Sequence, residues 1–188
     1  DVAVAWWMLD GLRLAAAVRL ATTIFFAFGT VFWYTAQLAT TWYQAHIVAV
    51  GLAMLAVGFA LRADPAAQDD EPGFDDRDAP PPDPTPRFAT WRERLAVDPR
   101  QFAVGLLFGL ACTARLTVVF AAPFFMLVGS GGSWWRRSWS AGLGAILPVG
   151  LLLAYNLVTA GDLLHPAYDY LYQLEAAAYR PLGYDPSW

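Results

Sequence analysis

The stretch that decides the fold is residues 101–128, QFAVGLLFGLACTARLTVVFAAPFFMLV. A helix that crosses the hydrocarbon core of a bilayer needs about 20 apolar residues, so this run is too long for one simple span. Its only charged residue, Arg115, stands near the midpoint, where a charge costs about 2.5–3.5 kcal/mol on insertion scales. We therefore predict two short helices that enter the membrane and return, with a break at residues 113–117 and Arg115 at the tip. A single span is the alternative.

The composition is that of a membrane protein. Hydrophobic residues make up 57% of the 188 residues, and several runs approach the length of about 18 apolar residues that indicates a transmembrane helix. Ten of the 16 acidic residues fall within residues 64–98, so the net charge of -4 belongs to one loop. We predict an all-α, polytopic transmembrane helix bundle with a broken or re-entrant helix pair. Because the chain opens inside an apolar segment, we expect a fragment of a larger protein.

Residues 1–62 are expected to form transmembrane helices. Residues 2–9 are predicted to end an upstream span, and residues 21–38 and 43–61 to form a hairpin of two spans, each about 28 Å long. Aromatic side chains crowd the turn between these spans, as they do at membrane interfaces: Trp33, Tyr34, Trp42 and Tyr43.

Residues 63–86 are acidic and proline-rich, and they hold too little apolar surface to offset the entropy cost of ordering. We predict a disordered cytoplasmic loop there. In residues 87–100, Phe88, Trp91 and Leu95 recur at helical spacing among arginines, which favours an amphipathic helix on the membrane surface. A soluble regulatory motif is the alternative for this segment.

Arginines in short flanks indicate which side of a membrane is cytoplasmic. If the first two spans form a hairpin, the arginines on their flanks lie on the same side as the cluster in residues 87–100, and we predict that side to be cytoplasmic. Arg136 and Arg137 lie on this cytoplasmic side only if residues 101–128 enter the membrane and return to the side from which they entered. The flanking arginines are Arg13, Arg19 and Arg62.

Residues 101–158 complete the predicted transmembrane region, with a last span at residues 141–158. Gly105 and Gly109, spaced as G-x-x-x-G, permit close approach of a second helix, and we interpret them as a packing feature. Residues 159–188 are predicted to begin an extracytoplasmic loop or domain. The expected location is the plasma membrane, with several spans.

Three stretches of the chain are similar to segments of the GT-C type membrane glycosyltransferases. The sequence FGT at residues 28–30, with an aromatic residue close behind, resembles their FGT-plus-aromatic segment. Residues 105–115, GLLFGLACTAR, resemble a glycine-rich element that ends in Arg or Lys. Residues 155–168, YNLVTAGDLLHPAY, resemble a YN-x2-R-F-G-[ND]-P-x3-GY motif at the start of an outer loop. The resemblance covers most of residues 21–170 outside the acidic loop.

The resemblance implies an enzyme like the protein O-mannosyltransferases and the aminoarabinose transferase of lipid A. These enzymes move a sugar from a polyprenyl-phosphate-linked donor to an acceptor on the extracytoplasmic face. Arg115 stands at the family's basic position, which implies contact with the lipid phosphate. The family's catalytic Asp would precede residue 1, so no catalytic residue is assigned. Thr159 stands where an Arg is common, and His165 where a proline-aromatic pair is usual, which implies a different acceptor.

The chemistry of Arg115 itself suits a lipid phosphate, because a guanidinium is a planar fork that binds phosphate oxygens bidentately. The alternative is an arginine that reaches from a helix end to the membrane surface. His46, one turn into the second predicted span, is a candidate for binding sugar or phosphate, or for ligating a metal. A lone histidine is more often a hydrogen-bonded interfacial residue.

Further candidates for substrate or acceptor binding gather where the last span ends: Asn156, Asp162, His165, Tyr168 and Asp169. Asp162, His165 and Asp169 are residue types that would suit a divalent cation or acid–base chemistry, but their spacing alone does not support such a group. Asn156 and Asp162 are better explained as organisers of the turn. We therefore assign no metal site and no firm cofactor, and a divalent cation remains the alternative.

The expected partners are the lipid bilayer and a polyprenyl-phosphate-linked sugar. Two other functions remain open: a transporter with an anion site at Arg115, and a membrane scaffold without catalysis. Nucleic-acid binding is excluded, because the basic residues are few and stand at membrane edges. The sequence also lacks the phosphate-binding, dinucleotide-binding and metalloprotease motifs of common soluble enzymes.

Overall fold

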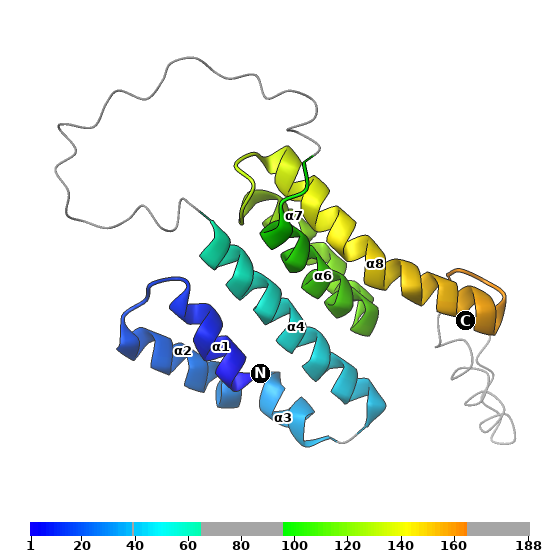
Figure 1. The fold of residues 1–188 in the computed structure, drawn as a ribbon. Coiled ribbons are helices and arrows are strands. Elements are labelled where there is room, and N and C mark those ends of the chain that lie inside the picture. Colours follow the sequence, from blue (N-terminus) through cyan, green and yellow to red (C-terminus); the bar gives the residue numbers. More distant parts are fainter. Residues whose placement is uncertain (39, 65–95, 165–188) are drawn as a thin grey trace, which may run out of the picture. The chain divides into compact units, whose positions relative to one another are not determined.

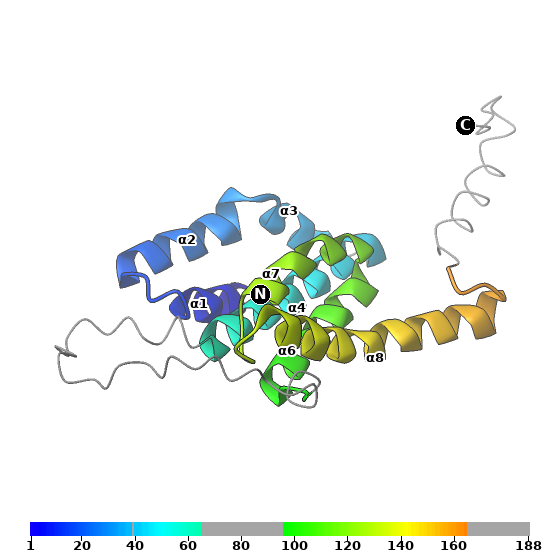
Figure 2. The same cartoon turned by 90° about the horizontal axis from the view of Figure 1, so that it is seen from above.

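The computed structural model describes residues 1–38, 40–64 and 96–164. Every regular element in these residues is helical, which confirms the predicted all-α class (Figure 1, and Figure 2 from above). Contacts divide the chain into two compact units, Asp1–Val149 and Gly150–Trp188. The elements are α1 (Val2–Asp10), α2 (Ala16–Gly29), α3 (Val31–Gln37), α4 (Thr41–Ala63), α6 (Pro99–Ala114), the 3-10 helix η3 (Leu116–Ala121), α7 (Ala122–Leu127) and α8 (Trp134–Ala160).

Within the described residues, two helical segments are long and apolar enough to cross a membrane, Tyr43–Ala63 in α4 and Trp134–Ala160, which is α8. The pair α2 and α3 would make a third if it is one bent span. The chain is thus a polytopic membrane bundle in composition and helix length. α8 starts seven residues before the span expected at residues 141–158, because the Trp-rich segment before that span is also helical.

The helical segment at residues 21–38 differs in its bounds and shape from the straight span that the sequence predicts, because the helix begins earlier and breaks at Thr30. α2 starts at Ala16, and α2 and α3 are bent by 52°. Thr30 has an extended backbone, its hydroxyl donates to the carbonyl of Phe26 at 2.7 Å, and it accepts the N–H of Phe32 at 3.2 Å. The side chain thus ends one helix and caps the next, which replaces the continuous hydrogen-bond ladder that a straight span needs.

Residues 101–128, called the hairpin below, form the broken helix pair that the sequence predicts. α6 ends at Ala114, Arg115 is extended, and η3 and α7 follow. Gln101, in the first turn of α6, donates from Nε2 to the carbonyl of Phe125 at 2.8 Å. Farther along α6, the rings of Phe108 and Phe125 lie 4.8 Å apart. The two arms therefore run side by side, and the chain reverses at Arg115 after about 24 Å of α6.

α6 packs against both α4 and α8 within the first unit. Its contact with α4 forms a core of small and apolar side chains: Ala56, Ala60, Val104, Phe108, Cys112 and Phe125. The surface of α6 that faces α8 is formed by glycines. A Cβ on Gly105 would overlap the main chain of Ala141, and a Cβ on Gly109 would lie 2.7 Å from Cα of Ala145. The interpretation of Gly105 and Gly109 as a packing feature is confirmed.

Polar contacts join the open end of the hairpin to the neighbouring helices. Asp98 caps α6: it accepts the N–H of Gln101 at 2.9 Å and the hydroxyl of Ser130. Asp64, at the end of α4, accepts the N–H of Gly129 at 3.2 Å. Gly129 has a φ of 126°, a conformation that residues with a Cβ rarely adopt. We call this end of the unit, where Arg62, Asp64, Asp98, Arg136 and Arg137 lie, the arginine-rich end.

The charge state of Asp98 suits its role as a cap. Burial raises the pKa of this carboxyl, but hydrogen bonds from Ser130 and from the main chain of Gln101 and Arg100, together with the charge of Arg136, outweigh burial. The pKa therefore lies below its ordinary value of 3.8. An ionised carboxylate at a helix N-terminus is stabilised by the positive end of the helix dipole.

Most of the predicted acidic loop and surface helix lies outside the described residues. Of residues 63–100, only 63–64 and 96–100 are described. α6 already begins at Pro99, so the last two residues of the expected surface helix belong to the hairpin arm.

Candidate anion site at the tip of the hairpin

Arg115 stands at the turning point of the hairpin, between the end of α6 and the start of η3. Its backbone φ of -150° and ψ of 110° are extended, so it interrupts the helix. Its N–H still donates to the carbonyl of Ala111 at 2.9 Å, and its carbonyl accepts the N–H of Val118 at 3.1 Å. The break therefore keeps its main-chain hydrogen bonds while it directs the side chain away from the helix ladder.

His46 meets Arg115 from α4. The guanidinium Nη2 of Arg115 contacts the ring nitrogen Nε2 of His46. A guanidinium can only donate, so Nε2 of His46 must accept, which requires a neutral imidazole with its proton on Nδ1. This contact fixes the direction of the guanidinium. The structure thus brings together two residues that the sequence singled out separately.

The pair lies far from the arginine-rich end. His46 stands 16 residues before Arg62 on the same helix, which is about 24 Å along the axis. Both side chains of the pair are half-buried. The 3-10 helix η3, which follows Arg115, carries exposed apolar side chains, with Leu116 at 76% and Phe120 at 84%. A cation beside an exposed apolar surface is the arrangement that suits an amphipathic anion.

Aromatic residues lie near the N-terminal end of α4, as the sequence predicts. The rings of Tyr34 and Tyr43 meet edge to face with centroids 6.0 Å apart. This contact connects α3 to α4 a few residues before His46. A tyrosine pair at a helix end is typical of a membrane interface, where the ring is apolar and the hydroxyl is wet.

The other candidate residues that the structure describes, Asn156 and Asp162, lie at the C-terminal end of α8. Asn156 donates from Nδ2 to the carbonyl of Leu163 at 3.3 Å, and Asp162 accepts the N–H of Leu164 at 3.2 Å. Both contacts organise the turn after the helix, which agrees with the structural explanation of these residues. His165, Tyr168 and Asp169 lie outside the described residues. Among the described residues, no three His, Cys, Asp or Glu side chains are grouped to hold a metal ion.

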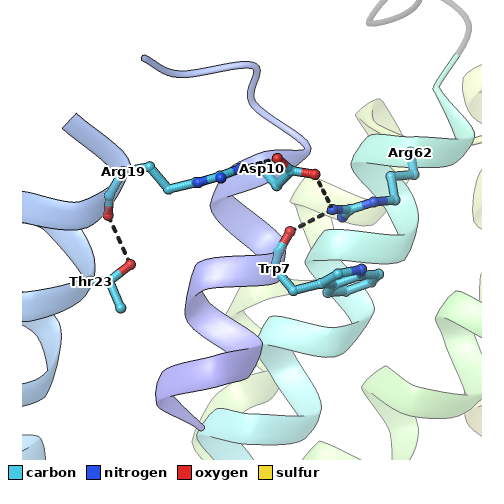
Figure 3. Close-up of polar contacts among 5 residues, drawn as sticks. All are labelled: Trp7, Asp10, Arg19, Thr23 and Arg62. Carbon is cyan, nitrogen blue, oxygen red and sulfur yellow. Dashed lines mark hydrogen bonds and ion pairs between the residues drawn. The ribbon is translucent and has the colours of Figure 1, made fainter. Parts of the chain in front are cut away.

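The sequence did not identify a second polar group, which we call the Arg–Asp cluster: Asp10, Arg19 and Arg62 (Figure 3). Arg19 and Arg62 approach the two carboxylate oxygens of Asp10 from α2 and α4. Arg19 also lies over the ring of Trp6 and Arg62 over the ring of Trp7, each 3.9 Å from the centroid. The sequence feature that could have indicated this cluster is Asp10, an acid at the end of an apolar segment and only nine residues before Arg19.

Comparisons of the chain with protein-family models, with curated proteins and with solved structures find no match.

Proposed function

We propose that this chain is part of an integral-membrane glycosyltransferase of GT-C type that uses a polyprenyl-phosphate-linked sugar. The observation that carries the proposal is the contact of Arg115 with His46 at the tip of the hairpin. A guanidinium is a planar group whose N–H groups match the oxygens of a phosphate. This is the contact that a departing lipid phosphate requires, since charge develops on it during transfer.

The surroundings of the pair support a lipid as the bearer of the phosphate. The exposed apolar side chains continue along the return arm at helical spacing: Leu116, Val119, Phe120, Met126 and Leu127. An isoprenoid tail can lie against such a surface while its phosphate reaches Arg115. The resemblances at residues 28–30, 105–115 and 155–168 point the same way, since they lie in the family's order.

Binding of a polyprenyl phosphate tests the proposal. The chain is reconstituted in phosphatidylcholine nanodiscs and titrated with polyprenyl phosphate and, separately, with polyprenol, which lacks the phosphate. We expect the phosphate form to bind about tenfold to a hundredfold more tightly, because a charge-assisted hydrogen bond contributes about 1.5–3 kcal/mol. Arg115→Gln should remove the difference. Arg100→Gln, which removes the same charge from the opposite end of α6, should keep it.

Two results would contradict the proposal. Equal affinities for polyprenyl phosphate and polyprenol would exclude a phosphate site at Arg115. Anion flux through proteoliposomes that Arg115→Gln abolishes, without any sugar transfer by the protein, would favour the transporter instead.

The proposed orientation places the arginine-rich end in the cytoplasm and the Arg115–His46 pair toward the extracytoplasmic side of the plasma membrane. The arginines in short flanks support it, as does the hydrogen bond from Nε of Arg136 to the carbonyl of Ala96 at 3.0 Å, which brings both flanks of the hairpin to one end. Residues 161–188 would then be extracytoplasmic.

Thiol labelling at Ser133 checks this orientation. Ser133 is exposed in the loop between α7 and α8, and the natural thiol of Cys112 is buried. In Ser133→Cys, an impermeant maleimide should label the protein in inverted membrane vesicles and leave it unlabelled in whole cells. Labelling in whole cells would show that this loop is outside.

A further inference from the structure

We propose that the first turns of α8, residues 134–140, are an anchor that binds the boundary between the lipid headgroups and the acyl chains. We call these residues, WWRRSWS, the tryptophan segment. The inference does not depend on the proposed function, because it involves neither a sugar nor a phosphate site. The partner is the lipid interface itself.

The length of α8 leaves the tryptophan segment outside the hydrocarbon core. α8 has 27 residues and is therefore about 40 Å long, whereas the core is about 30 Å thick. Residues 141–160 contain no charged side chain and are long enough by themselves to cross the core. Both arginines of α8 precede them. The tryptophan segment therefore falls at the level of the headgroups.

The polar side chains of the tryptophan segment are bound to the protein. Nε of Arg136 donates to the carbonyl of Ala96 at 3.0 Å, and Nη1 of Arg137 donates to the last carbonyl of α7 at 2.6 Å. Oγ of Ser140, which is fully buried, accepts the N–H of Asp98 at 2.9 Å. The segment thus directs its polar groups inward, toward the base of the hairpin.

The tryptophans of the segment are turned outward instead. Trp134, Trp135 and Trp139 are 56%, 52% and 40% exposed. Ile146 is also exposed and follows Trp139 by two turns on the same side of α8, so the tryptophan surface is continuous with the apolar surface of the span. Three exposed indoles above buried polar groups would be an unfavourable surface in water. They suit the lipid boundary, where the ring is on the apolar side and its N–H on the wet side.

An anchor at this level also holds the hairpin at a fixed depth. The tryptophan segment is bound to Ala96 and Asp98 before the hairpin and to Leu127 near its end. The base of the hairpin therefore cannot move into the hydrocarbon core without drawing the arginines of the segment with it, and the cost of placing arginine in the core opposes that movement.

Quenching of tryptophan fluorescence by brominated lipids measures the depth of the three rings. The chain is reconstituted in phosphatidylcholine vesicles whose acyl chains carry bromine either near the headgroup or near the terminal methyl. The triple variant Trp134→Phe, Trp135→Phe, Trp139→Phe keeps apolar rings at these positions, and the emission that it lacks reports the three tryptophans. We expect the shallow bromines to remove most of that emission and the deep bromines little of it, because the boundary lies about 15 Å from the bilayer midplane.

Ile146→Trp in the triple variant is the matched control. It places one ring on the same side of α8, about 10 Å farther along the helix than Trp139. We expect the reverse order for this ring, with stronger quenching by the deep bromines. In every variant the buried thiol of Cys112 should react with a maleimide as slowly as in the natural protein, which shows that the helices are assembled.

Four results would overturn the proposal. Stronger quenching of the three rings by the deep bromines would place them in the core. Quenching by aqueous iodide without quenching by either lipid would place them in water. Quenching by neither reagent would show that protein covers them. The same order of quenching for Ile146→Trp and for the three rings would show that the tryptophan segment has no depth of its own.

Discussion

Arg115→Ala is expected to lower sugar transfer by about one to two orders of magnitude while the helices stay assembled. The estimate follows from the value of one charge-assisted hydrogen bond, about 1.5–3 kcal/mol, if that bond strengthens as the lipid phosphate departs. Arg115→Lys should retain part of the rate, because an ammonium can meet one phosphate oxygen without the bidentate fork. The measurement is transfer from a polyprenyl-phosphate-linked donor by membranes that contain the protein.

The buried thiol of Cys112 gives the necessary control on folding. It is the only cysteine of the chain and lies in α6, one turn before Arg115. In a folded variant its thiol should react with a maleimide as slowly as in the natural protein. Transfer at the natural rate by a folded Arg115→Ala variant would rule out the phosphate role of Arg115.

Gly105→Ala should have the largest effect on stability. The added Cβ would overlap the carbonyl and Cα of Ala141, so α6 and α8 would have to move apart. Overpacking of this kind costs about 1–3 kcal/mol, and main-chain atoms cannot rotate away as a flexible side chain can. For a chain of this size we expect the unfolding midpoint to fall by roughly 2–12 °C. The onset of Cys112 labelling on heating in detergent reports that midpoint.

Gly142→Ala makes the same chemical change eight residues into α8, at a position where nothing lies within 4 Å of the added carbon. Its midpoint should stay the same or rise slightly, since alanine is favoured over glycine in a helix by about 0.5–1 kcal/mol. If both variants unfold at the same temperature, the close contact between α6 and α8 does not stabilise the protein.

The hairpin could be predicted because two independent signals agree on it. The run is longer than one span needs, and its single charge marks the place where the run turns. The break at Thr30 gave no such signal, since the apolar sequence continues through it and threonine is tolerated in membrane helices. That break depends on local hydrogen bonds between the Thr30 hydroxyl and the main chain of Phe26 and Phe32, which hydropathy does not register.

The residues of the candidate anion site could be predicted from the sequence, but their contact could not. Arg115 and His46 stand out singly, as polar residues in apolar surroundings. Their contact joins positions 69 residues apart, and α4 is apolar all round, so no stripe in the sequence shows which of its sides faces α6. Gln101 was overlooked because a single amide at the start of an apolar run looks like a boundary residue, whereas it is fully buried against α7.

The return of the hairpin to its starting end bears on how the chain enters the bilayer during synthesis. α6 has 16 residues, and η3 with α7 has 12, so each arm is shorter than the roughly 20 residues that a translocon retains as a stop-transfer helix. In the proposed orientation, neither arm is long enough to insert alone, so we expect integration only after both arms have left the ribosome. No charged flank of the hairpin crosses the membrane in this orientation, and Arg115 is the one charged side chain within residues 101–128 that enters it.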